Sequence, residues 1–122
     1  MLLNDFFTLK SFHFEHDVLA EVLLNPAHEI YRGHFPGQPI VPGVCMLQMI
    51  KEVLEKALGQ RLLLKKAFNI KFIAFIDPQE HSQIQLSLKI LSQEEETKVR
   101  ASLYKEDQVF FKFSGSFSSY KL

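Results

Sequence analysis

The sequence has a single cysteine, Cys45, no tryptophan, and no excess of either charge. One cysteine excludes an intrachain disulfide and is typical of a protein from a reducing compartment. Lys and Arg together number 14, as do Asp and Glu, so no net field attracts nucleic acid or a membrane surface. No uncharged apolar run approaches the ~18 residues that a membrane-spanning helix needs. We therefore expect a cytoplasmic protein that binds neither nucleic acid nor membrane.

The first ten residues, MLLNDFFTLK, lack the basic start and the long apolar stretch of a secretory signal peptide. The chain also lacks internal repeats and low-complexity linkers. Together with the length of 122 residues, this predicts one domain over residues 1–122. The hydrophobic share of 47% is typical of a globular protein with an ordinary core.

Hydrophobic patterns predict two strands, one long helix and then about four further strands. Residues 6–14 and 17–24 are β-rich and separated by a short turn, which would pair them as a hairpin. The helix is expected over residues 42–58, because Pro42 suits its first position and Gly59 its end. This order predicts an α+β fold in which an antiparallel sheet wraps around one helix. The later strands are expected within residues 64–76, 84–90, 99–105 and 109–117.

The first half of the predicted helix is almost entirely apolar. From Pro42 to Ile50 the sequence is PGVCMLQMI, in which Gln48 has the only polar side chain. A helix that is apolar all round is buried all round, so we expect this half to be enclosed, with Gln48 inside the enclosure. The alternative is that Gln48 extends the polar face formed by Lys51 and Glu52.

Proline and glycine concentrate just before this helix, with four of the five prolines and three of the five glycines between Pro26 and Gly43. Each proline fixes its own φ and favours an extended residue before it, so this segment is rigid. His34 lies in it and can take a proton near neutral pH. The first N–H groups of the helix, at Gly43 and Val44, have no intrahelical partner and could polarise a carbonyl group. These features predict proton abstraction next to a carbonyl, beside an apolar enclosure that suits an acyl chain.

The segment from His34 to Val44, HFPGQPIVPGV, matches the signature H-F-P-G-x-P-x-x-P-G-V of the FabZ/FabA-type 3-hydroxyacyl-acyl-carrier-protein dehydratases. The chain resembles that family, and the resemblance implies a hotdog fold with His34 as the catalytic base. It implies that the Gly43 N–H holds the thioester carbonyl, and that Phe35 and Val44 also contact the substrate. It further implies active sites at a dimer interface, no metal or redox cofactor, and a substrate carried on the phosphopantetheine arm of acyl carrier protein or CoA.

One position departs from the family. Its acid, Glu or Asp, lies fourteen residues after the histidine, where this chain has Gln48. An amide can donate a hydrogen bond but cannot give up a proton at neutral pH. A general acid contributes typically ~10²–10⁴-fold to the rate. Glu52, one turn further along, would replace it only if the site were displaced; otherwise His34 takes the C2 proton and returns it to the departing hydroxyl.

Three functions are compatible with these residues. The first is a hydro-lyase that converts 3-hydroxyacyl thioesters to trans-2-enoyl thioesters in fatty-acid or polyene-type biosynthesis, with His34 and Gln48 in its active site. It would act as a homodimer or a larger oligomer of dimers. The second is an acyl-thioester-binding subunit, non-catalytic or half-catalytic, whose missing acid comes from a Glu-bearing paralogue in a heterodimer. The third, a hotdog thioesterase, ranks lowest because the helix start lacks the carboxylate that such enzymes use.

Overall fold

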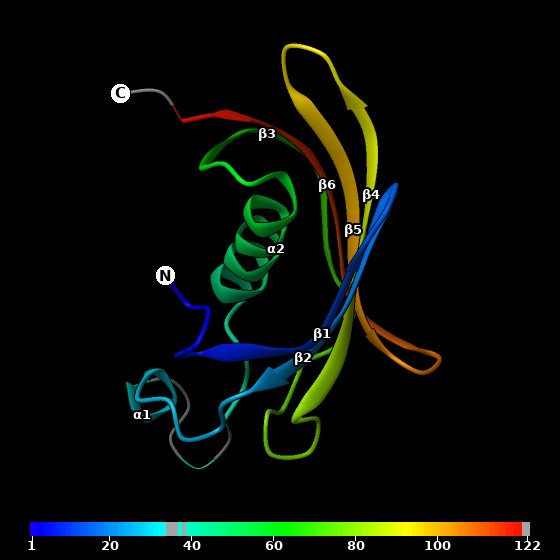
Figure 1. Cartoon of the computed structure of the whole chain (residues 1–122). Coiled ribbons are helices and arrows are strands. Elements are labelled where there is room, and N and C mark those ends of the chain that lie inside the picture. Colours follow the sequence, from blue (N-terminus) through cyan, green and yellow to red (C-terminus); the bar gives the residue numbers. More distant parts are fainter. Residues whose placement is uncertain (34–36, 38, 121–122) are drawn as a thin grey trace.

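The computed structural model describes residues 1–33, 37 and 39–120 and shows a curved antiparallel sheet with one long helix on its concave side (Figure 1). The helices are α1 (Ile30–Gly33) and α2 (Gly43–Leu58). The strands are β1 (Phe7–Phe14), β2 (Asp17–Leu24), β3 (Leu62–Phe72), β4 (Gln83–Gln93), β5 (Thr97–Lys105) and β6 (Gln108–Ser119).

The six strands lie in the order β1-β2-β4-β5-β6-β3. β1 and β2 form the predicted antiparallel hairpin, with Phe14 opposite Val18 next to the turn. β3 follows α2 in the chain and pairs with β6, the last strand. The helix therefore lies in sequence between the two edge strands, β1 and β3, and in space it lies across the concave face of the sheet. This arrangement confirms the predicted α+β class and the hotdog fold.

Alternation along the strands places one row of side chains against α2 and the other row on the outer face of the sheet. In β4, Ile84, Leu86 and Leu88 are fully buried, whereas the residues between them are only half-buried. A period of two is what a strand with one wet face requires. The side chains of α2 that are buried with them are Cys45, Met46, Met49, Ile50, Glu52, Val53 and Leu54.

The ends of α2 follow from the residues that flank it. Pro42 has the extended backbone of an N-cap (φ −64°, ψ 146°), and Gly43 is the first helical residue. Gly59 has a left-handed φ of 66°, and its N–H donates to the Glu55 carbonyl oxygen at 2.8 Å. A left-handed residue after the last turn favours glycine, so the predicted end of the helix is confirmed.

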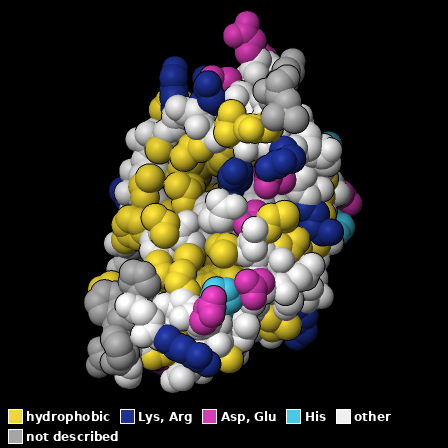
Figure 2. All heavy atoms as spheres, turned by 90° about the vertical axis from the view of Figure 1, so that its left-hand side faces the viewer, with side chains coloured by type: hydrophobic (Ala, Val, Ile, Leu, Met, Phe, Trp, Pro, Cys, Tyr) yellow, Lys and Arg dark blue, Asp and Glu magenta, His cyan; other side chains and the backbone are white. Residues whose placement is uncertain are grey.

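The first half of α2 is not enclosed by its own chain, so the expectation drawn from its composition is wrong for the single chain. Val44 is 78% exposed, because the sheet covers only one side of the helix. The other side is open, and on it hydrophobic side chains gather in a band beside charged ones (Figure 2). An apolar sequence predicts that a helix is covered, but it does not show whether its own chain supplies the cover.

The run after α2 does not form one strand to residue 76, as was predicted. β3 ends at Phe72, and the N–H groups of Ile73 and Ala74 both donate to the Phe110 carbonyl oxygen at 2.9 and 3.2 Å. Residues 73–76 then fold back toward the start of α2, where the Ile76 carbonyl oxygen accepts from the Val41 N–H at 2.9 Å. This return brings apolar side chains to the helix N-terminus.

Replacing a core leucine of α2 tests this packing. Leu54 is fully buried, so Leu54→Ala should lower the free energy of unfolding by about 2–5 kcal/mol, because it removes buried apolar groups and leaves a cavity behind. Leu91→Ala is the matched control, because that side chain is 53% exposed and its truncation should change stability by about 0.5 kcal/mol. Urea denaturation at one fixed protein concentration measures both. Equal decreases in the two variants would contradict the described core.

Candidate active site

The first turn of α2 is fixed from both sides of Pro42. Before it, the Val41 N–H donates to the Ile76 carbonyl oxygen; after it, the Pro42 carbonyl oxygen accepts from the N–H groups of Cys45 at 3.0 Å and Met46 at 3.2 Å. The N–H groups of Gly43 and Val44 have no hydrogen-bond partner among the residues that the structure describes. They carry the positive end of the helix dipole and are suited to an oxygen with partial negative charge.

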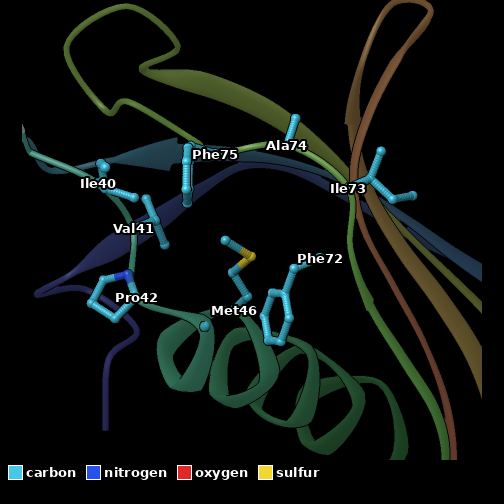
Figure 3. A pocket seen from close by; sticks show the side chains of 9 residues that line it. Ile40, Val41, Pro42, Met46, Phe72, Ile73, Ala74 and Phe75 are labelled. Atoms are coloured by element: carbon cyan, nitrogen blue, oxygen red, sulfur yellow. The ribbon is translucent and has the colours of Figure 1, made fainter.

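An apolar cavity of about 310 Å³ opens at this helix start (Figure 3). Met46 points into it from α2, while Phe72 and Phe75 enter from β3 and the returning segment. None of the described side chains that line it is polar, so the hydrogen-bonding groups that these residues offer to the cavity are those of the backbone. An acyl chain would be desolvated here without leaving a buried polar side chain unpaired. The full lining is Ile40, Val41, Pro42, Gly43, Met46, Phe72, Ile73, Ala74 and Phe75.

Gly43 allows a close contact with the side chain of Phe72. A Cβ atom at this position would lie 2.6 Å from Cε1 and 2.7 Å from Cζ of Phe72, far closer than carbon atoms pack. The Phe72 ring therefore rests directly on the backbone of the first helical residue. Glycine thus lets the apolar wall of the cavity reach the two free N–H groups.

The structure brings together only some of the residues predicted for the site. Gly43 lines the cavity, whereas the Val44 side chain is exposed and does not. His34 and Phe35 lie outside the described residues; in the sequence they directly follow Gly33, the last residue of α1. Their predicted roles stay predictions.

Gln48 lies on the open side of α2 and does not line the apolar cavity. Its Nε2 donates to Oε2 of Glu52 at 2.8 Å. Glu52 is only 1% exposed, and its carboxylate also accepts from the N–H groups of Leu2 and Leu3 at 2.8–3.0 Å. Glu52 is thus occupied in holding the N-terminal segment and is not placed to act as a displaced acid. Within one chain Gln48 extends the polar face of the helix, the alternative considered above; its catalytic role stays a prediction.

Two further groups near the helix start carry polar atoms in buried surroundings. Burial raises the pKa of the Cys45 thiol, which therefore stays protonated at neutral pH and packs as a small apolar side chain. Burial, followed by the nearby Cys45 and Asp77, also raises the pKa of Tyr31. Its hydroxyl is buried and has no hydrogen-bond partner among the described residues. The sequence reasoning missed Tyr31, whose only signal was its position three residues before His34.

The fold and the cavity define a hotdog protein whose helix start can hold a carbonyl oxygen at the entrance to an apolar space. Comparison with protein families matches residues 10–115 to the ApeI-like family, described as ApeI dehydratase. The chain belongs to this dehydratase family.

Individual relatives agree with this assignment. The 3-hydroxyacyl-[acyl-carrier-protein] dehydratase FabZ of Clostridium acetobutylicum is 28% identical over 67 residues, which cover 49% of this chain and 48% of that protein. The match thus spans about half the length of this curated relative.

Solved structures support the fold. The dehydratase heterocomplex ApeI:P from Xenorhabdus doucetiae superposes with a TM-score of 0.72 at 19% identity, over 90% of this chain and 96% of that chain. A hypothetical thioesterase from Streptococcus pneumoniae gives 0.62 at 10% identity, over 98% and 95% of the two chains. At these identities the likeness is one of fold.

Among the described residues, neither helix is long and apolar enough to cross a membrane.

Proposed function

We propose that the protein removes water from 3-hydroxyacyl thioesters to give trans-2-enoyl thioesters. The observation that carries this proposal is the Gly43 N–H, which has no hydrogen-bond partner among the described residues, at an apolar cavity of about 310 Å³. A thioester carbonyl that accepts from this N–H would place its acyl chain in the cavity. Membership of a dehydratase family supports a hydro-lyase reaction at this position.

In the proposed reaction the imidazole of His34 takes the proton from C2 of the substrate. The negative charge that develops on the carbonyl oxygen is stabilised by the Gly43 N–H and the helix dipole. The bond between C3 and its hydroxyl oxygen then breaks, and the proton held by His34 returns to that oxygen, so that water leaves. Gln48 would donate a hydrogen bond to the departing hydroxyl, but it supplies no proton.

The carrier of the proposed substrate is inferred from the relative that the chain resembles. The curated relative acts, by its name, on acyl carrier protein, and we infer a phosphopantetheine-linked substrate, on acyl carrier protein or CoA, for this chain also. Fatty-acid and polyene-type biosynthesis both produce such 3-hydroxyacyl groups. Dehydration is redox-neutral and is complete with two proton transfers, so we expect no metal or redox cofactor.

Removal of the proposed base provides the direct test. His34→Ala should lower turnover of a 3-hydroxyacyl carrier-protein substrate by ~10²–10⁴-fold, because the C2 proton then has no acceptor. His13→Ala is the control, since that side chain is exposed on β1 and should leave the rate unchanged. Product analysis by mass spectrometry distinguishes an enoyl thioester from a free acid. Wild-type turnover no faster than that of His34→Ala would refute the dehydratase, and a free acid would indicate the thioesterase.

A second chain completes the site in this proposal. One of the two edge strands of the sheet is β3, whose exposed apolar side chains include Leu63, Leu64, Phe68, Ile70 and Phe72. An exposed apolar edge strand beside an open helix face is typical of a surface that is covered by a partner. We infer a homodimer, and larger oligomers of it, formed through this surface, which would also cover Gln48.

Substitution in β3 tests the dimer. Phe68→Glu should convert the protein to a monomer, because an isologous interface would bury two carboxylates near its centre. Leu91→Glu is the matched control, since Leu91 is similarly exposed (53% against 58%) but belongs to β4. Sedimentation equilibrium gives the mass of each. A wild-type protein that sediments as a monomer, or a Leu91→Glu variant that dissociates equally, would contradict the proposal.

The second candidate function rests on Gln48 alone. If this chain is an acyl-thioester-binding subunit, a Glu-bearing paralogue supplies the missing acid in a heterodimer. The solved Xenorhabdus doucetiae structure is a heterocomplex by its own description, which supports this alternative.

Restoring an acid separates the two candidates. Gln48→Glu should raise the rate of the isolated protein by ~10²-fold or more if a general acid is missing. The new carboxylate would lie beside Glu52, so the variant is paired with Gln48→Glu/Glu52→Gln, which keeps the hydrogen bond between the two positions. Steady-state kinetics measures both. Unchanged rates in both variants would show that the glutamine already suffices or that the fold serves another task.

A further inference from the structure

The outer face of the sheet, away from α2, has a shallow hollow of about 390 Å³ over β3, β6, β5 and β4. Its lining includes four cations, Lys71, Lys89, Arg100 and Lys112, and no carboxylate among the described residues. The chain as a whole is neutral, so this concentration of one sign is a local feature. We call these four residues and the space between them the cationic hollow.

The register of the strands places these cations in like-charged pairs. Lys71 lies directly opposite Lys112, and Lys89 lies directly opposite Arg100. Like charges that face each other across two strands destabilise a sheet. Asp17 is opposite Lys89 on the other side, yet every ion pair among the described residues involves a histidine. None of the four cations is therefore held in an ion pair with a described residue, although Asp17 lies next to Lys89.

Neutral hydrogen-bond donors lie between the cations. Ser87 and Ser102 are opposite each other, with their hydroxyl oxygens 2.8 Å apart, and Ser114 is opposite Asn69. One hydrogen is enough for the bond between the two serines, so the other hydroxyl hydrogen is available to a ligand. All three serines are half-buried, whereas the four cations are exposed. The hollow thus has hydroxyl donors at its floor and positive charge at its rim.

We propose that the cationic hollow binds a phosphate group that carries at least two negative charges. A phosphate presents several strong acceptor oxygens in a compact group that can reach recessed hydroxyls. The fixed fork of Arg100 suits two of those oxygens at once, and the lysines supply charge. An acidic protein surface would match the charge, but it would not fill a hollow or use the serines. The site lies on the face opposite the apolar cavity and does not depend on the proposed dehydratase reaction.

Titration calorimetry with sodium pyrophosphate at constant ionic strength tests this site on the full chain. We expect saturable binding of one pyrophosphate per chain. Arg100→Gln/Lys112→Gln should weaken binding about 100-fold, since each charged donor removed weakens it about tenfold. Arg61→Gln/Lys105→Gln changes the net charge equally outside the hollow and should bind as the wild type does. Non-saturable binding, or equal weakening in both double variants, would overturn the proposal.

Thermal unfolding provides a second readout with the opposite sign. Without pyrophosphate, Arg100→Gln/Lys112→Gln should raise the melting temperature, because it removes one member of each like-charged pair. With pyrophosphate, the wild type should gain stability and the variant should not. A variant that melts lower than the wild type without ligand would show that these cations stabilise the sheet, and would overturn the proposal.

Two further probes identify the source of the phosphate. Vesicles of phosphatidylcholine with phosphatidic acid, whose phosphomonoester can carry two negative charges, compared with phosphatidylcholine alone, test a lipid headgroup. A protein that binds pyrophosphate but not the acidic vesicles supports a free phosphate compound. A protein that binds pyrophosphate and the acidic vesicles, with both kinds of binding lost in Arg100→Gln/Lys112→Gln, supports a lipid phosphate. Binding of polyglutamate in place of pyrophosphate would overturn the proposal in favour of an acidic protein partner.

Discussion

The apolar face of α2 packs into the concave side of the sheet, and this packing determines where the first turn of the helix lies relative to the strands. Because Met46, Ile50 and Leu54 are held by the strands, the first turn is set at the end of the returning segment after β3. The Phe72 ring can then rest on Gly43 only because that residue has no side chain. The free N–H groups, the cavity and its apolar wall are consequences of one helix seated in one sheet.

The same arrangement leaves half of the helix without cover. Val44 is exposed and Gln48 is half-buried, on the side of the helix that the sheet does not cover. The proposed site, which uses Gly43 and the Gln48 position together, would therefore need a second chain to close it. The apolar composition of the helix start agrees with that proposal.

Local sequence signals predicted most of the fold. β2 was predicted with both of its ends, and α2 to within one residue, because hydrophobic pattern, proline and glycine all act locally. The end of β3 was missed because the apolar run continues unchanged into the segment that folds back. The hydrogen bond from the Leu2 N–H to Glu52 joins residues 50 positions apart, and a single sequence contains no pattern that predicts so distant a contact. The motif identified the family, but no local pattern could show that Gln48 faces away from the cavity.

The bond between Gln48 and Glu52 also constrains which residues can occupy these two helix positions together. A glutamate at position 48 would replace a donor with a second acceptor at 2.8 Å from a carboxylate that is already satisfied by main-chain N–H groups. Two such carboxylates cannot both ionise without strong repulsion. The two helix positions are therefore coupled, so the effect of a glutamate at position 48 depends on which residue occupies position 52.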